Sequence, residues 1–404
     1  MRMLLPAVLL ALTLGCSPDP MPAEAGGTDA PVMRVATWNA SLTSDEAGGL
    51  LARLEADDED ARRVAAIIQR LRPDILLLNE FDYDPAHAAA DLFESAFLGV
   101  DQFGERAIHY PYRYLAPVNT GVPSGFDLDG NGRTDEPADA WGFGHHPGQY
   151  GMLLLSMHPL DQDRARSFRT LRWADLPGHR RPVDPASGEP WFPEAAWEAM
   201  PLSSKSHWDV PVLTPLGRVH VLAAHPTPPV FDGPENRNGL RNHDEIRLWA
   251  EYLSDPDAAW LVDDRDRAGG LHPDAAFVIL GDYNADPVDG DSVPGAIQQL
   301  LEHPRVLDAP APASPGAVEA AAAKGGANLG HRGDPAHDTG NFSPVAGNLR
   351  VDYVLPSTGF RVVDSGVYWP LPADDDLGST RASDHHLVWV DLSPGPDGGD
   401  AAGR

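Results

Sequence analysis

Short apolar runs bounded by turn-forming residues recur along the chain. They indicate β-strands, because each is too short for an ordinary helix. The runs cover residues 32–38, 74–78, 151–155, 218–224, 276–280, 350–355 and 386–392. We expect a strand at each of them.

Two other segments carry apolar residues at helical spacing, so that each presents one apolar stripe. Pro73 ends the first segment. Many strands, few helices and long polar insertions predict packed sheets flanked by helices, with the chemistry on the connecting loops. The stripes consist of Val64, Ile67, Ile68 and Leu71 in one segment and of Ile246, Trp249, Ala250 and Leu253 in the other.

The N-terminus has the layout of a bacterial export signal, in which Arg2 precedes an apolar run over residues 4–14 and Gly15 and Cys16 follow. Cys16 is the only cysteine, so no intramolecular disulfide can form, and it stands where a lipoprotein signal would be cut. Thr13 departs from the aliphatic residue that most such signals carry. We expect an exported protein, either a periplasmic or cell-envelope lipoprotein with lipid on Cys16 or a secreted protein.

The two ends of the chain differ in composition from the rest. Residues 17–32 and 394–404 are rich in Pro, Gly, Ala and Asp and offer little to bury. We therefore expect a signal peptide over 1–16, a flexible tether over 17–32, one folded domain over 33–393 and a disordered tail over 394–404.

The chain has 60 acidic and 30 basic side chains, which give a formal charge of −30. Proteins bind nucleic acids largely through Lys and Arg, which displace counterions from the phosphates. The charge therefore disfavours DNA or RNA as a partner, although divalent cations could offset the repulsion at one site.

Apolar strands repeatedly end in a carboxylate, carboxamide or imidazole. Taken singly, each such residue is most simply a turn former, a helix cap or a buried histidine. Together they supply the oxygen ligands that Mg²⁺ or Mn²⁺ prefers. The residues are Asn39, Glu80, His225, Asp282 with Asn284, Asp352, and Asp384 with His385.

The order of these segments and their residue patterns resemble those of the endonuclease/exonuclease/phosphatase superfamily, the group similar to deoxyribonuclease I. The resemblance covers about residues 33–393 and rests on ATWNAS, LLLNEFD, AAHPTPP, GDYNADP, RVDYVLPS and ASDHHLV. It implies an α/β fold, a four-layer sandwich of two mainly antiparallel β-sheets flanked by helices.

The resemblance also implies a divalent metal site for Mg²⁺ or Mn²⁺. Glu80 would be the principal metal carboxylate, and Asn39 and Asp384 would help to hold the metal and its water shell. The same oxygens could serve one metal ion or two.

The remaining roles concern the attacking water and the phosphate. By the resemblance, Asp282 would orient or deprotonate the water, and Asn284 would hold the water or a phosphate oxygen. His385 would contact phosphate oxygens with its ring held by Asp352, and His225 would be the second histidine, for which the sequence offers no carboxylate partner.

One position departs from the family pattern. Met157 follows Ser156, where the family often has arginine, so a phosphate contact there would have to come from elsewhere. Exposed basic residues are usually solvated surface. The candidates are Arg180, Arg181, Lys205 and Arg241.

The segment FDLDGNGRTDE follows the first positions of a calcium-binding loop, with oxygen ligands at alternate residues and a glycine for the sharp turn. Ala138 stands where a bidentate carboxylate would complete such a loop, but Glu136 or Asp139 could substitute. We expect structural Ca²⁺ over residues 127–139, with an ordinary acidic turn as the alternative. The ligands would be Asp127, Asp129, Asn131 and Asp135.

These features predict an exported, divalent-metal-dependent phosphoesterase that hydrolyses phosphate monoesters or diesters by in-line attack of an activated water. A secreted nuclease of the same fold is the nearest alternative. A non-catalytic surface binding module is another. We expect a phosphate ester as substrate, contact with a membrane only through a lipid on Cys16, and no protein partner.

Overall fold

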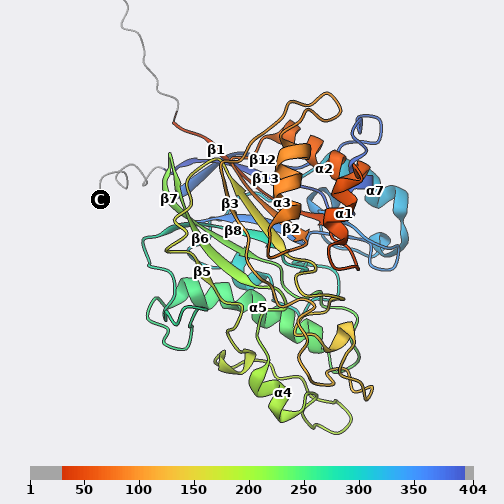
Figure 1. The fold of residues 1–404 in the computed structure, drawn as a ribbon, viewed down its shortest axis with the longest axis vertical. Coiled ribbons are helices and arrows are strands. Elements are labelled where there is room, and N and C mark those ends of the chain that lie inside the picture. The colour runs from red at the N-terminus through yellow and green to blue at the C-terminus, as the bar shows by residue number, and fades with distance from the viewer. Residues whose placement is uncertain (1–29, 396–404) are drawn as a thin grey trace, which may run out of the picture. The chain divides into compact units, whose positions relative to one another are not determined.

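A computed structural model describes residues 30–395 (Figure 1). The predicted signal peptide with Cys16, most of the predicted tether and nearly all of the predicted tail lie outside the described residues. The chain from Pro31 onward groups into one compact unit.

The first sheet has six strands and is antiparallel except for the parallel pair β1 and β2. Its central strand β2 is apolar at successive positions because both faces are covered. In spatial order the strands are β12 (Phe360–Val367), β13 (Val388–Pro394), β1 (Met33–Leu42), β2 (Ile75–Phe81), β4 (Met152–Ser156) and β3 (Tyr112–Tyr114).

The second sheet has five strands, of which only β7 and β8 run parallel. A short pair, β9 (Gly340–Asn341) and β10 (Asn348–Leu349), stands apart from it. In spatial order the strands are β11 (Asp352–Pro356), β8 (Ala276–Asp282), β7 (Gly217–Ala224), β6 (His207–Thr214) and β5 (Arg166–Ser167).

The helices differ in length. The two that the sequence predicts are α2 and α5. The α-helices are α1 (Gly49–Glu55), α2 (Glu59–Leu71), α3 (Ala88–Leu92), α4 (Glu194–Ala199), α5 (Arg237–Ser254), α6 (Gln298–Leu301), α7 (Pro315–Lys324) and α8 (Ser379–Ala382). Single helical turns of other kinds cover Phe93–Leu98, Pro137–Asp139, Trp173–Asp175, Gly326–Leu329 and Pro335–His337.

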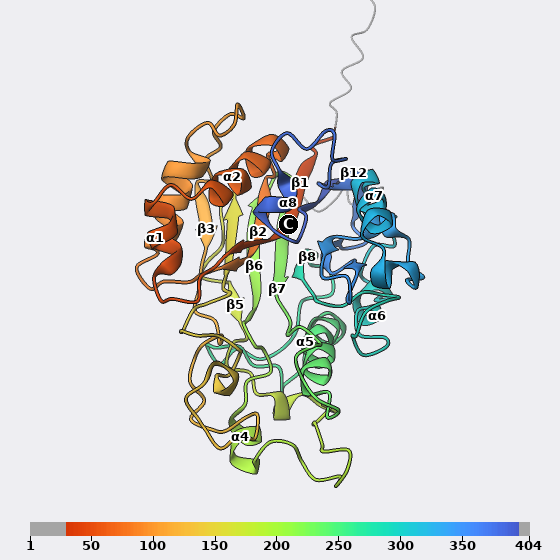
Figure 2. The same cartoon turned by 90° about the vertical axis from the view of Figure 1, so that its right-hand side faces the viewer.

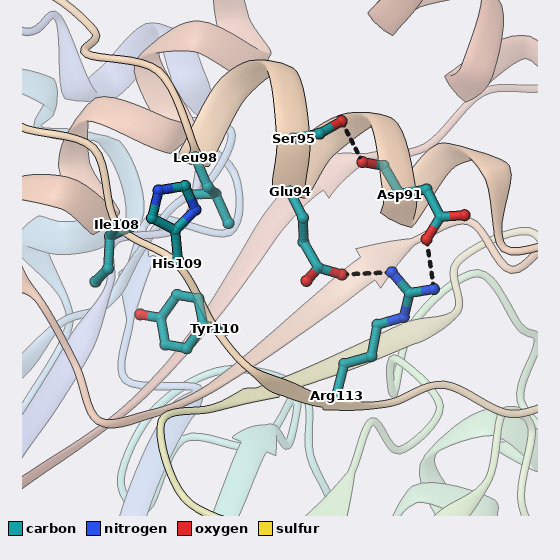
Figure 3. A pocket seen from close by; sticks show the side chains of 8 residues that line it. All are labelled: Asp91, Glu94, Ser95, Leu98, Ile108, His109, Tyr110 and Arg113. Carbon is teal, nitrogen blue, oxygen red and sulfur yellow. Dashed lines mark hydrogen bonds and ion pairs between the residues drawn. The ribbon is translucent and has the colours of Figure 1, made fainter.

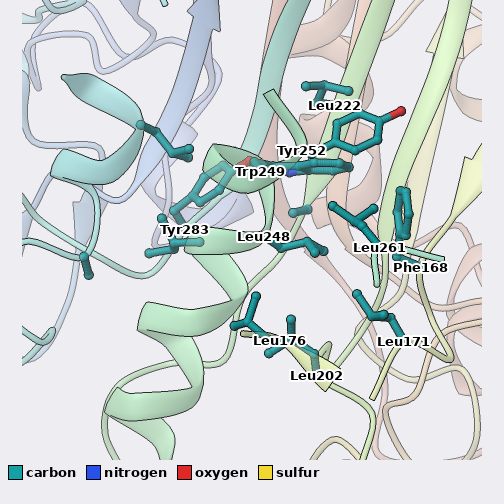
Figure 4. Close-up of a cluster of buried hydrophobic side chains, with 14 of the residues drawn as sticks. Phe168, Leu171, Leu176, Leu202, Leu222, Leu248, Trp249, Tyr252, Leu261 and Tyr283 are labelled. Atoms are coloured by element: carbon teal, nitrogen blue, oxygen red, sulfur yellow. The ribbon is translucent and has the colours of Figure 1, made fainter. Parts of the chain in front are cut away.

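Three apolar cores hold four layers together (Figures 1 and 2). One lies between the sheets and joins residues such as Leu77 of β2 and Leu280 of β8. Another joins the outer face of the first sheet to α1, α2 and α3. The third joins the outer face of the second sheet to α5, where Trp249 and its aromatic neighbours pack (Figure 4). The predicted sandwich of two mainly antiparallel sheets flanked by helices is confirmed.

Each apolar run that the sequence analysis assigned to a strand is a strand in the structure: β1, β2, β4, β7, β8, β11 and β13. Strands β3, β5, β6, β9, β10 and β12 were not predicted. Among the helices of the described residues, none is both long and apolar enough to cross a membrane.

Candidate active site

Strand pairing brings the predicted polar residues of the second sheet to one edge. Asp352 at the start of β11 lies opposite Asp282 at the end of β8. Strand β7 runs parallel to β8 with Ala223 beside Leu280, so His225, directly after β7, comes level with Asp282. Three strands therefore deliver an acid, an imidazole and a second acid side by side.

Asp282 lies at the centre of this group. Its Oδ2 accepts a hydrogen bond from Asn39 Nδ2 at 3.1 Å. The same oxygen is 3.4 Å from His225 Nε2 and 3.7 Å from His385 Nε2. The carboxylate partner of His225, which the sequence did not reveal, is thus Asp282.

The backbone around Asp282 is also fixed. Its N–H donates to Asn79 Oδ1 at 3.2 Å, and its Oδ1 accepts from the Asn284 N–H at 2.9 Å. Asn284 has a left-handed φ of 50° and donates from Nδ2 to the Pro226 carbonyl at 3.2 Å. The turn after β8 therefore points Asn284 toward the loop that follows His225.

A buried carboxylate orients His385. The distance from His385 Nδ1 to Asp352 Oδ2 is 2.9 Å, and the Thr339 hydroxyl donates to the same oxygen at 2.7 Å. The Phe342 ring meets the His385 ring edge-on at 5.2 Å between centroids. The imidazole is thereby held with Nε2 toward Asp282, and its contact with Asp352 is the one that the family resemblance implies.

The charges of these groups depend on one another. Burial alone would lower the pKa of His385, but the carboxylates of Asp352 and Asp282 outweigh it and raise that pKa well above its ordinary value. Burial would raise the pKa of Asp282, but His385 and His225 hold it below the usual range. Burial and the positive charge of Lys205 lower the pKa of His225 to about 4. At neutral pH the site thus holds an imidazolium, a carboxylate and a neutral imidazole.

Glu80 lies at the end of β2, next to Asn79, and has a left-handed φ of 56°. Burial raises the pKa of its carboxyl, while the nearby Asn39 amide and the charge of His385 act in the opposite direction. Within residues 30–395 no Lys or Arg pairs with this carboxylate. Asn39 on the first sheet therefore donates to Asp282 on the second sheet and lies close to Glu80.

The structure only partly gathers the predicted metal ligands. Among the described residues, the compact ligand group at this edge is Asp282, Asp352 and His385. Asp384 is exposed, and its backbone carbonyl accepts from Asn341 N at 2.7 Å. The metal roles of Glu80, Asn39 and Asp384 stay predictions.

Two supporting residues were missed from the sequence. Asn79 precedes Glu80 in an apolar strand, and a buried amide there could have been noticed as a site signal. Thr339 lies in an irregular segment, and nothing in its sequence context indicates that its hydroxyl holds Asp352.

The basic residues that were considered as phosphate contacts differ in their exposure and in their partners. Ser156 is the last residue of β4 and pairs with Ile75, whereas Met152 at the other end of β4 pairs with Asn79, so a basic residue at 157 would not reach the site. Arg180 is exposed. Arg181 pairs with Glu194, and Arg241 donates to backbone carbonyls of Pro201 and Leu202. Lys205 is only 5% exposed and is not a surface residue.

The acidic loop at 127–139 folds around Asp127. Its carboxylate accepts from the backbone N–H groups of Gly130, Asn131 and Gly132. The carboxylates that approach one another are those of Asp127, Asp129 and Asp139. Asp135 was predicted as a ligand, but it is outside this group and faces Arg133 at 3.5 Å, because the turn at Pro137–Asp139 brings Asp139 inward instead.

A surface pocket on the first sheet is separate from this edge (Figure 3). Arg113 on β3 is neutralised there by Asp91 and Glu94, both at 2.6 Å. Its strand neighbour Tyr112 pairs with Ser156, at the end of the sheet remote from Glu80. The pocket therefore offers no unpaired cation to an anionic ligand and is not the candidate active site.

Solved structures of similar fold come from several bacteria. An endonuclease/exonuclease/phosphatase from Beutenbergia cavernae has 20% identity and a TM-score of 0.49, with 90% of this chain and 72% of that chain covered. Sphingomyelinase C from Streptomyces griseocarneus has 16% identity and a TM-score of 0.45, covering 89% and 99%. A beta toxin variant from Staphylococcus aureus with bound magnesium ions has 11% identity and a TM-score of 0.44, covering 90% and 100%.

None of the curated proteins compared with the chain matches it. The model of the endonuclease/exonuclease/phosphatase family matches residues 36–385, which include every part of the site described above. The chain therefore belongs to the endonuclease/exonuclease/phosphatase family, a family of metal-dependent phosphoesterases and nucleases.

Proposed function

We propose that this protein hydrolyses phosphate monoesters or diesters by in-line attack of a water molecule, with Mg²⁺ or Mn²⁺ as cofactor. The observation that carries the proposal is the arrangement around Asp282. One carboxylate faces an amide, a neutral imidazole and a carboxylate-bound imidazolium within 3.7 Å.

The residues at the end of β2 fit a hard divalent cation. The Glu80 carboxylate is largely buried without a cationic side chain paired to it, and the Asn39 amide lies beside it. A buried unpaired carboxylate is costly unless a cation compensates its charge. Glu80 and Asn39, with Asp384 nearby in the sequence motif of His385, would hold the metal ion. When bound, it would polarise the phosphoryl group as a Lewis acid.

Asp282 serves the attacking water in this proposal. Its carboxylate is fixed by Asn39 and by the Asn284 N–H, so that an oxygen is held for a hydrogen bond from water. A carboxylate whose pKa is lowered is a weak base. Asp282 therefore orients the water and accepts its proton only as the phosphorus–oxygen bond forms.

The two histidines take different parts. His385, charged and held by Asp352, donates from Nε2 to an equatorial phosphoryl oxygen and compensates the charge that spreads there. His225 is neutral and within 3.4 Å of Asp282. It hydrogen-bonds the water or the phosphate without adding charge.

The charge balance supports a small phosphoester over a nucleic acid. The formal charge is −30, and several arginines are engaged by carboxylates or backbone carbonyls, as Arg181, Arg237 and Arg241 are. Nonspecific binding along a polyanion needs a track of free cations. Hydrolysis of plasmid DNA is therefore an outcome of the test below and not the expected one.

The substrate class is tested with the full chain after metal removal. Hydrolysis of 4-nitrophenyl phosphate, bis(4-nitrophenyl) phosphate and plasmid DNA is measured with and without added Mg²⁺ or Mn²⁺. Asp282→Asn is the test variant. Asp291→Asn, which changes an exposed carboxylate in the loop after the same strand, is its control.

We expect metal-restored turnover of a small ester that Asp282→Asn abolishes and Asp291→Asn keeps. Cleavage of DNA alone would establish the nuclease alternative. A folded, metal-loaded protein without turnover on any substrate would favour the non-catalytic binding module.

We also propose that the protein is exported and carries structural Ca²⁺ in the loop at 127–139. The export signal and Cys16 support the first statement, and the approach of three carboxylates supports the second. Metabolic labelling with a palmitate analogue in a bacterial host tests lipidation. Label that persists in Cys16→Ser would refute attachment at Cys16.

A further inference from the structure

We propose that the ammonium of Lys205 contacts a phosphoryl oxygen of the substrate and supplies positive charge there in addition to that of His385. The inference rests on the proposed function, since it assigns a further residue to the same phosphoryl group. Four observations support it: the position of Lys205 at the sheet edge, its burial, its lack of a direct partner, and the commitments of the other basic residues.

Lys205 enters the edge of the second sheet where the predicted catalytic residues lie. Strand β6 begins at His207, opposite Ala224, and runs antiparallel to β7. The segment before β6 therefore continues beside His225, which in turn is level with Asp282 on β8. Lys205 lies in a bend two residues before His207, next to the segment that contains His225.

The surrounding contacts fix the Lys205 loop without using its ammonium. Glu245 of α5 accepts from the Ser204 N–H at 2.7 Å and, through its other oxygen, from the Thr227 N–H at 2.6 Å. The Lys205 carbonyl accepts from the Asn119 N–H at 3.0 Å. One helix thus ties the loop before β6 to the loop after His225 and sets their spacing.

The Lys205 side chain is largely buried, and its ammonium is unpaired within the described part of the chain while keeping some access to solvent. Lys205 is 5% exposed, and within residues 30–395 its side chain makes neither a hydrogen bond nor an ion pair. Burial lowers the pKa of Lys205, while the carboxylates of Glu245, Glu80 and Asp282 act in the opposite direction. A buried cation among carboxylates that do not touch it is suited to an anion that brings its own oxygens.

Two other basic side chains of the described residues are already engaged by backbone carbonyls. The guanidinium of Arg241 holds backbone carbonyls, and Lys324, the other lysine, donates to the Phe342 carbonyl. The imidazolium of His385 reaches one part of the phosphoryl group, and Lys205 approaches from the β6 side. Two cations on different strands would compensate charge on different equatorial oxygens.

The test compares Lys205→Met and Lys205→Arg with Arg218→Met. Arg218 is a partly exposed cation at the opposite end of β7, so its loss controls for net charge. Three quantities are measured on the full chain with Mn²⁺: kcat/KM on the best small ester, the Kd of inorganic phosphate by calorimetry, and the Kd of Mn²⁺.

We expect Lys205→Met to lower kcat/KM by about 100-fold and to weaken phosphate binding by at least about tenfold. Mn²⁺ affinity should change by less than about threefold. Lys205→Arg should keep part of the phosphate affinity, and Arg218→Met should match the parent. Unchanged phosphate affinity in Lys205→Met with a lower Tm would overturn the proposal, because Lys205 would then only offset the charge of Glu245.

A measurement on the unaltered protein covers the case in which Lys205→Met does not fold. Because the chain has only two lysines, an amine-reactive reagent followed by peptide mapping reports on Lys205 and Lys324 separately. Phosphate with Mn²⁺ should protect Lys205 and not Lys324, and equal labelling of Lys205 with and without phosphate would refute the contact. Phosphate binding that depends on Lys205 without ester turnover would retain this inference and reject the proposed hydrolysis.

Discussion

Replacing Asp352 by Asn isolates the charge that holds His385. The neutral amide oxygen can still accept from the Thr339 hydroxyl and from His385 Nδ1, which now lie 2.7 and 2.9 Å from Asp352 Oδ2. Only the charge is lost. A hydrogen bond to a charged group contributes about 1.5–3 kcal/mol, which corresponds to a factor of about 10 to 150 in rate if it is fully expressed in the transition state.

We therefore expect Asp352→Asn to lower kcat/KM by about 10- to 150-fold, measured by metal-dependent hydrolysis of a 4-nitrophenyl ester at pH 7.5. The Tm should change little, because the shape of the side chain is kept. Asp364→Asn alters an exposed carboxylate on β12 and should match the parent. A kcat/KM of Asp352→Asn within about threefold of the parent, with the fold intact, would show that the Asp352 charge does not support His385 in catalysis.

Three further predictions concern stability. A Cβ on Gly281, whose φ is +151°, would lie 2.0 Å from a backbone oxygen of β7, so Gly281→Ala should lower the free energy of unfolding in urea by about 3 kcal/mol. Gly359→Ala has open space and no positive φ and should cost less than about 1 kcal/mol, and equal costs would contradict the steric argument. Burial lowers the pKa of His207 to about 3, so the stabilising contribution of its neutral ring is complete above the unfolded-state pKa and is lost as the pH falls toward 3. Between pH 7.5 and 5.0 the parent should lose about 2 kcal/mol of stability through His207. His207→Gln should lack this loss, and a loss of the same size in the variant would disprove the assignment to His207. Millimolar Ca²⁺ should raise the Tm of the parent and of Asp135→Asn but not of Asp127→Asn, and equal responses of the two variants would reduce the loop to an acidic turn.

The strands and the order of the motifs could be predicted because both are local. Burial between two layers requires continuous apolar residues, as in β2 and β8, and the polar residue that ends each run is visible directly after it. Strand β12 was missed because its buried and exposed residues do not alternate regularly, and a bulge shifts its register near Val362.

Contacts between distant segments could not be predicted. The sequence could not show that His225 faces Asp282, because that distance depends on the parallel register of β7 and β8. The burial of Lys205 likewise depends on the segment around Asn119 and on α5 covering the loop before β6. Solvation of a lysine is the usual outcome, and only tertiary packing overrides it here.

Isotope tracing shows whether water attacks the phosphorus atom of the substrate. Hydrolysis of the best small ester is followed in water enriched in ¹⁸O, with the metal-loaded parent, and the label is located by mass spectrometry. Water attack at phosphorus forms the new phosphorus–oxygen bond and expels the alcohol with its original oxygen, so we expect ¹⁸O in the phosphate product and none in the alcohol. Label in the alcohol, or metal-independent turnover that survives Asp282→Asn, would contradict it.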